Sequence, residues 1–101
     1  MADWYVSHGY VVLARNWRCA EGELDVIARA GPTLVVCEVK TRSSGRFGAP
    51  VEAVTRQKQL RIRRLTARWL TVSAPRVRPR DIRFDVASVR GGVVDVVEGG
   101  F

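Results

Sequence analysis

Two β-rich segments joined by a tight turn constrain the fold of this chain most. Residues 23–29 and 33–40 are rich in branched apolar side chains, and Ala30-Gly31-Pro32 between them is a turn signal. Two strands with so short a connection form an antiparallel hairpin. A symmetric turn centred between Gly31 and Pro32 pairs residues whose numbers sum to 63, unless a β-bulge shifts the register.

Both predicted strands carry charged side chains that a buried strand should lack. Glu23 and Asp25 share one face of the first strand, and Glu38 and Lys40 share one face of the second, because strand side chains alternate with period two. The register places Asp25 opposite Glu38 and Glu23 opposite Lys40. Facing Cβ atoms lie about 5 Å apart, and two carboxylates repel at that spacing unless a cation lies between them.

This arrangement suits a hydrolytic metal site. Mg²⁺ takes a few carboxylate oxygens and keeps water as its other ligands, and such a water can attack a phosphodiester. Lys40 beside that water would orient it or stabilise the extra negative charge. The alternative is an ordinary edge hairpin whose exposed ion pairs contribute little, and the spacing alone leaves both interpretations open.

The remaining segments complete an α/β pattern. We expect a short helix over residues 3–8 ended by Gly9, a strand over residues 10–17, and strands over residues 82–89 and 93–97 joined at Arg90-Gly91-Gly92. Pro50 suits the first turn of a long helix over residues 51–73. The apolar face of that helix is assigned to Val51, Val54, Leu60, Leu65 and Leu70. With 101 residues, the chain has material for one domain, a helix packed on a mixed sheet.

The positive charge is concentrated in one part of the chain. The net charge is +7, but residues 56–83 hold ten basic residues against one acid, Asp81, for a local charge of +9, which leaves −2 elsewhere. Clustered guanidinium groups favour a polyanionic partner, so nucleic acid comes first. A membrane-surface or protein-binding domain is the rival from another class, but it leaves Asp25, Glu38 and Lys40 unexplained.

Several other classes of protein are disfavoured. Cys19, Cys37 and the single histidine, His8, do not suffice for a structural zinc site, and Cys37 in an apolar run is expected to be a buried thiol. No apolar run approaches the roughly 20 residues of a membrane span. The first residues also lack the pattern of a signal peptide, so a cytoplasmic location is expected.

Several motifs together resemble a known family. Glu-Leu-Asp, twelve residues, and then Glu-Val-Lys resemble the PD-(D/E)XK nuclease signature. The motifs are Gly9-Tyr10, Arg15-Asn16-Trp17-Arg18, Gly22-Glu23-Leu24-Asp25, Glu38-Val39-Lys40-Thr41-Arg42, Phe47-Gly48, Lys58 and Arg83-Phe84-Asp85-Val86. They look like the YraN-like family of small bacterial proteins, predicted endonucleases related to Holliday-junction resolvases. The resemblance covers nearly the whole chain and implies a restriction-endonuclease-like core, with a mixed five-stranded sheet and a long basic helix.

The resemblance also implies roles for individual residues. Asp25 and Glu38 would be the ligands of Mg²⁺ or Mn²⁺, Lys40 would be the catalytic lysine, and Glu23 would be a supporting or substrate-side group. Gln57 and Lys58 would point from the helix toward the phosphate, with a surface pair as the alternative. The residues expected to contact nucleic acid are Arg42, Arg46, Arg61, Arg64 and Arg68.

The front of the chain departs from the family pattern. Family members usually begin with a longer helix of the pattern Gly-x-x-Gly-Glu-x-x-Ala, whose glutamate reaches the active site in resolvase-like relatives, and this sequence starts after that point. We therefore expect a truncated N-terminal helix. The leading hypothesis is a magnesium-dependent endonuclease acting on structured or branched DNA, with a homodimer supplying two sites for two strands. The alternative is a catalytically weak or inactive nucleic-acid-binding module of the same fold.

Overall fold

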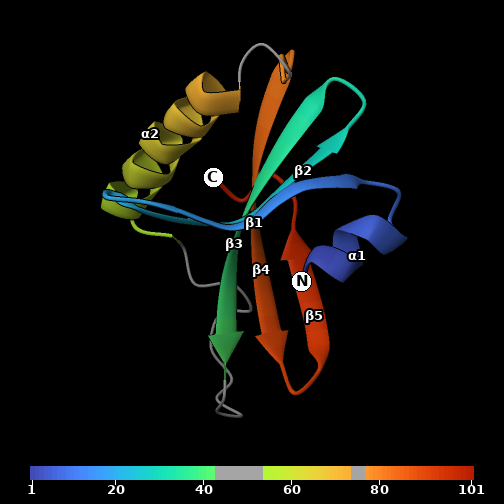
Figure 1. Ribbon diagram of the computed structural model, residues 1–101. Coiled ribbons are helices and arrows are strands. Elements are labelled where there is room, and N and C mark those ends of the chain that lie inside the picture. Colours follow the sequence, from blue (N-terminus) through green and yellow to red (C-terminus); the bar gives the residue numbers. More distant parts are fainter. Residues whose placement is uncertain (43–53, 74–76) are drawn as a thin grey trace.

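The computed structural model describes residues 1–42, 54–73 and 77–101 (Figure 1). The elements in chain order are α1 (Ala2–Ser7), β1 (Val11–Cys19), β2 (Gly22–Ala30), β3 (Thr33–Arg42), α2 (Arg56–Ser73), β4 (Asp81–Arg90) and β5 (Val93–Val97). The strands form one sheet in the order β1-β2-β3-β4-β5, and every neighbouring pair is antiparallel except β3 and β4, which are parallel. The predicted α/β arrangement with a mixed five-stranded sheet is confirmed.

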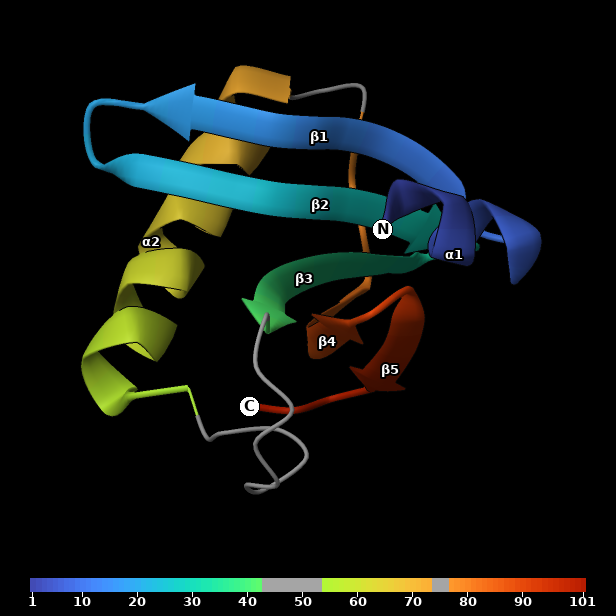
Figure 2. The same ribbon diagram turned by 90° about the horizontal axis from the view of Figure 1, so that it is seen from below.

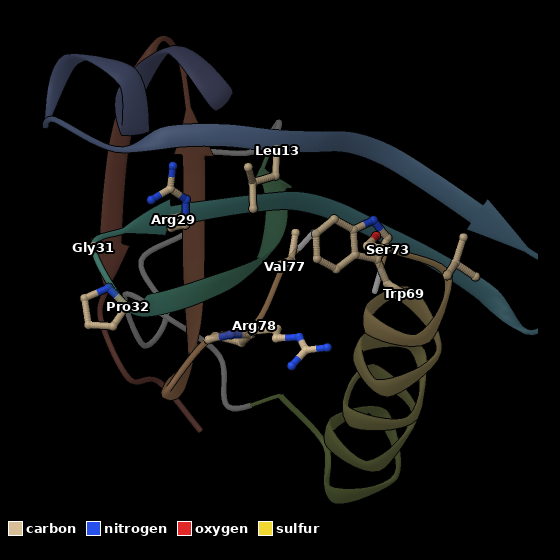
Figure 3. A pocket seen from close by; sticks show the side chains of 10 residues that line it. Leu13, Arg29, Gly31, Pro32, Trp69, Ser73, Val77 and Arg78 are labelled. Atoms are coloured by element: carbon tan, nitrogen blue, oxygen red, sulfur yellow. The ribbon is translucent and has the colours of Figure 1, made fainter. Parts of the chain in front are cut away.

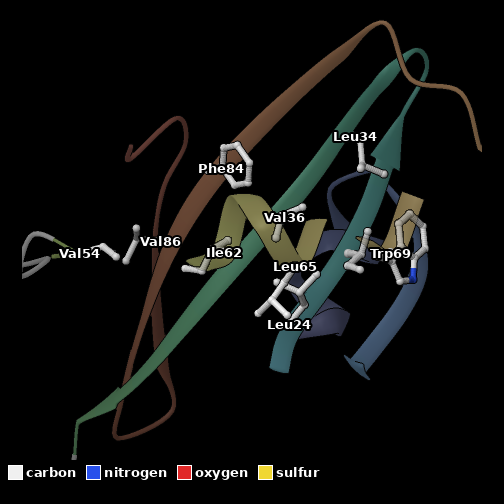
Figure 4. Close-up of a cluster of buried hydrophobic side chains, with 10 residues drawn as sticks. Leu24, Leu34, Val36, Val54, Ile62, Leu65, Trp69, Phe84 and Val86 are labelled. Carbon is white, nitrogen blue, oxygen red and sulfur yellow. The ribbon is translucent and has the colours of Figure 1, made fainter. Parts of the chain in front are cut away.

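The parallel pair explains the place of the long helix. Parallel neighbours cannot be joined by a tight turn, so the chain crosses over between them, and α2 lies in this crossover against one face of the sheet (Figures 1 and 2). The helix and the sheet enclose the α2-side cluster, drawn in Figure 4: Leu24, Ile27, Leu34, Val36, Val54, Ile62, Leu65, Trp69, Phe84 and Val86. A second group of buried residues, the α1-side cluster, contains one residue of α1 and residues of β2, β3 and β4: Tyr5, Val26, Ala28, Val35, Cys37 and Ala87.

The start and the apolar face of α2 differ from the sequence prediction. The helix begins at Arg56 rather than at residue 51; Val54 and Thr55 precede it, and residues 50–53 lie outside the described part of the chain. Thr55 Oγ1 accepts a hydrogen bond of 3.1 Å from the Lys58 N–H, which is the contact of an N-cap. Leu60 is 42% exposed, because at 100° per residue it lies about 140° around the helix from buried Leu65.

The packing places an aromatic ring and a thiol in the core. Trp69 is 6% exposed and belongs to the α2-side cluster. Cys37 is buried, as expected, and neither Cys19 nor Cys37 forms a disulfide. The short first helix ends next to Gly9, whose φ of +86° is the left-handed conformation typical after a helix. Among the described residues, no helix is long and apolar enough to span a membrane.

A buried carboxylate joins the two ends of the chain to the sheet. Asp85 of β4 has no exposed surface, and its two oxygens accept hydrogen bonds from the Tyr5 hydroxyl (2.7 Å), from Arg83 Nε and Nη2 (2.8 and 3.0 Å) and from the Gly99 N–H (3.0 Å). Arg83 also donates to the Tyr10 hydroxyl at 2.8 Å. The carboxylate raises the pKa of Arg83 above its usual range, so the guanidinium stays charged.

Candidate active site at the fork between β2 and β3

The β2–β3 hairpin has the predicted register only over part of its length. Residues pair with numbers that sum to 63 from Ala30 and Thr33 to Val26 and Cys37, where the ladder ends. Beyond that point, the Val39 N–H donates a hydrogen bond of 2.8 Å to Asp25 Oδ2, a side-chain oxygen. Figure 2 shows β3 turning away from the β1–β2 hairpin. We call this region, which contains Asp25, Glu38, Val39 and Lys40, the fork.

The two carboxylates predicted to be neighbours lie together at the fork. Burial, a hydrogen bond with Glu38 and the negative charges of Glu38 and Glu23 raise the pKa of Asp25 to about 6, while the Val39 N–H acts in the opposite direction. The Asp25 side chain is therefore held in a place that disfavours its own charge. Such a site gains from a cation that neutralises the pair.

Glu38 connects the fork to the helix. Glu38 is 8% exposed, and its carboxylate forms an ion pair with the ammonium group of Lys58 on α2. The Thr55 cap positions the backbone of Lys58 in the first turn of that helix. Lys58 thus points from α2 toward Glu38, and its predicted contact with a phosphate stays a prediction. Gln57, its neighbour, is exposed.

Lys40 lies two residues beyond Glu38 on β3 and is half-buried. Residues two apart in a strand share a face, so Lys40 continues the row begun by Glu38. The hairpin register predicted Glu23 opposite Lys40, and this prediction is wrong. Glu23 pairs instead with Arg18 across β1 and β2, with 2.7 Å between Arg18 Nε and Glu23 Oε2, because the β2–β3 ladder ends before reaching it.

The predicted nucleic-acid contacts fall into two groups. Arg61, Arg64 and Arg68 are exposed on α2, and their spacing of three and four residues places them along one stripe. Arg68 Nη1 also lies 3.4 Å from Glu21 Oε1. Arg42 ends β3, but its side chain and the whole of Arg46 lie outside the described part of the chain.

Two hollows flank these features. One of about 430 Å³ adjoins the fork and is lined by Asp25, Val39, Thr41, Arg15 and Asn16, together with the first residues of α1. A larger hollow of about 970 Å³ lies between the C-terminal end of α2 and the β2–β3 turn, away from the fork (Figure 3). Leu13, Trp69 and Val77 line its apolar side, and none of its lining residues within the described part of the chain is a carboxylate.

The carboxylates of the fork fit a hard divalent cation, though they form a small ligand set. Among the described residues, no group of three or more His, Cys, Asp or Glu side chains is placed to hold a metal ion. Asp25 and Glu38 supply two. Mg²⁺ commonly binds through one or two protein carboxylates and keeps several waters, so the pair fits its chemistry.

The sequence did not reveal two features of this site. The Val39 N–H that holds Asp25 is a backbone group, and no residue type signals it. The left-handed backbone of Asn16, with a φ of +50°, lies in the middle of β1. Asparagine is the residue that most readily takes this conformation after glycine, and this is the one signal available beforehand.

The Asp25→Asn variant is expected to be more stable than the wild type at pH 8, by about 1–2 kcal/mol after allowance for solvent screening. The folded protein binds the Asp25 proton more tightly than the unfolded chain, so the free energy of unfolding falls as pH rises from about 4 to about 7. Asparagine keeps an oxygen for the Val39 N–H and loses the charge. Urea unfolding at pH 4 and pH 8 measures the difference.

The matched control is Asp95→Asn, which neutralises an exposed carboxylate on β5. This variant should show no gain at either pH. A loss of stability in Asp25→Asn at pH 8 would contradict the prediction, because it would mean that the charged carboxylate stabilises the fold.

Comparison with known proteins gives the family. The model of "Uncharacterised protein family UPF0102" matches residues 1–89. The UPF0102 protein of Nocardioides sp. is 54% identical over 99 residues, covering 93% of this chain and 78% of its own length. That of Beutenbergia cavernae is 55% identical over 86 residues (85% and 71%), and that of Kineococcus radiotolerans is 57% identical over 81 residues (80% and 66%). The chain therefore belongs to the UPF0102, or YraN-like, family.

Proposed function

We propose that this protein is a metal-dependent endonuclease that hydrolyses phosphodiester bonds in structured or branched DNA, with a core of the PD-(D/E)XK type. One observation carries the proposal: Asp25 and Glu38 lie together at the fork, where burial and the neighbouring Glu38 carboxylate raise the pKa of Asp25. Carboxylates brought together at the cost of stability are typical of a functional site.

Three side chains of the fork, and Lys58 of α2, have roles in this proposal. Asp25 and Glu38 hold Mg²⁺ or Mn²⁺, which supplies a water of lowered pKa and neutralises negative charge on a phosphodiester. Lys40 stabilises the charge that develops on the phosphate during attack. Lys58, paired with Glu38, neutralises that carboxylate while no metal is bound.

The basic stripe of α2 provides the binding surface. Replacing Arg61, Arg64 and Arg68 together by glutamine should weaken binding of a four-way DNA junction and reduce the slope of log affinity against log salt by about 2 to 3. Each lost phosphate contact removes close to one released counterion. Fluorescence anisotropy between 50 and 200 mM salt measures both quantities.

The control for this prediction is Arg63→Gln on the same helix. The Arg63 guanidinium lies over the Phe84 ring, 4.5 Å from its centroid, so its charge is already engaged in the fold. Its loss should leave the salt slope nearly unchanged. An unchanged slope in the triple variant would argue against α2 as the nucleic-acid surface.

A second candidate function is a binding module of the same fold with little or no turnover. It is favoured by the small ligand set, since only two carboxylates gather at the fork among the described residues. Fewer ligands hold a cation more weakly. This protein would bind branched DNA through α2 without cutting it.

The deciding experiment is cleavage of a labelled four-way junction with Mg²⁺ or Mn²⁺, beside duplex and single-stranded DNA. The wild type is compared with Glu38→Ala and Lys40→Ala, each checked for folding. Cutting that requires the metal and both residues supports the nuclease. Salt-sensitive junction binding without cutting supports the binding module, and vesicle binding without junction binding overturns both. Sedimentation of the protein with the junction measures whether two copies act together.

A further inference from the structure

Asn16 has a strained backbone in the middle of a strand. Its φ of +50° is the only positive φ of a non-glycine residue in the described part of the chain. The side chain is exposed, and within the described residues it makes no hydrogen bond. Strain of this kind persists only where the surrounding structure imposes it, and it concentrates at functional sites.

The strained residue lies directly across the sheet from a fork carboxylate. Arg15 pairs with Val26 and Trp17 pairs with Leu24, so the position opposite Asn16 is Asp25. The register is the same on both sides of this position. The irregular backbone of β1 at Asn16 therefore lies next to Asp25 on β2.

At this position the side chains of both strands switch from one face of the sheet to the other. Leu24 packs in the α2-side cluster and Val26 packs in the α1-side cluster, although residues two apart in a regular strand share a face. Trp17, the partner of Leu24, also packs against the α2-side cluster. Because both strands change face together, the pairing survives and only the side-chain directions reverse. Asp25 lies at the reversal, where its carboxylate reaches the Val39 N–H.

We infer that Asn16 is a positioning residue for Asp25. Its left-handed backbone switches the face on which the side chains of β1 lie. Because β2 stays paired with β1, its side chains switch face as well, and this places the Asp25 carboxylate at the fork. The backbone conformation matters here and the amide group does not. The part of this inference that concerns metal binding rests on the proposed function, whereas the part that concerns the Asp25–Val39 hydrogen bond does not.

The test compares Asn16→Gly with Asn16→Val in the full chain. Glycine takes a positive φ without strain, and valine almost never does. The first readout is the amide proton shift and solvent exchange of Val39 by NMR, which report its hydrogen bond to the Asp25 carboxylate. The second is Mn²⁺ affinity. Arg29→Val is the control, because it places the same side chain at an exposed position of β2 with an ordinary backbone.

Asn16→Gly should keep the Val39 amide shift and bind Mn²⁺ within about twofold of the wild type. Asn16→Val should move that shift upfield, speed its exchange and weaken Mn²⁺ binding about tenfold or more, in the range for groups that orient metal ligands. If the valine variant does not fold, Asn16→Ala replaces it. Equal behaviour of the glycine and valine variants, or a Val39 shift unchanged in both valine and alanine variants, overturns the inference. Failure of the wild type to bind Mn²⁺ counts against the metal site, and the Val39 readout still decides the positioning role.

Discussion

The Lys40→Met variant is expected to bind a four-way junction and Mn²⁺ as well as the wild type but to cleave the junction about 100- to 1,000-fold more slowly. Lys40 is half-buried beside Glu38, on the same face of β3. A charge in such a place acts mainly on the negative charge that develops during attack, so its loss lowers the rate rather than the affinity. Single-turnover cleavage with saturating protein separates the two effects.

Lys58→Met is the matched control for this experiment. It removes the same charge from the other lysine of the site, which is paired with Glu38. Freeing Glu38 from this partner should tighten Mn²⁺ binding, because the ammonium group and the metal compete for the same carboxylate. We expect a smaller loss of rate than in Lys40→Met. Equal losses in both variants, or full activity in Lys40→Met, would contradict the distinct role assigned to Lys40.

The register of the β2–β3 hairpin was predictable from sequence only as far as the fork. Local turn chemistry set the register near Gly31 and Pro32, and that register holds to Val26 and Cys37. The fork was not predictable, because it depends on a side chain taking the place of a backbone partner. Asp25 and Glu38 were predicted to be neighbours, and they interact in the structure. The two strands separate only just before these residues, so the side chains stay within reach of each other.

Other parts of the site required tertiary information. Glu23 was expected opposite Lys40, but the end of the β2–β3 ladder leaves it with Arg18 on the other neighbouring strand. Lys58 was left between a site residue and a surface residue, because its role depends on the angle at which α2 crosses the sheet. Helical periodicity was misjudged at Leu60, which lies away from the buried face. Spacing along the sequence fixes which residues share a face but not which face is covered.

The Asp85→Ala variant is expected to lose about 3–5 kcal/mol of stability, the usual cost of removing one partner from a buried ion pair. Asp85 is fully buried and accepts four hydrogen bonds, two of them from Arg83. Its loss leaves the buried Tyr5 hydroxyl without its acceptor and leaves Arg83 with the exposed Glu98 carboxylate, 3.4 Å away, in place of Asp85. Domains of this size have only about 5–15 kcal/mol in total, so the midpoint of thermal unfolding should fall by roughly 15 °C or more.

The position of this carboxylate predicts where the damage appears first. Tyr5 anchors α1 and Gly99 belongs to the C-terminal segment, so amide exchange should accelerate at both ends of the chain beyond the global loss. Asp95→Ala is the control, because it removes an exposed carboxylate from neighbouring β5 and should cost less than about 0.5 kcal/mol. A near-neutral Asp85→Ala would mean that water satisfies Tyr5 and Arg83. The hollow beside Asp25 would then keep its lining from α1 without the hydrogen bond between Tyr5 and Asp85.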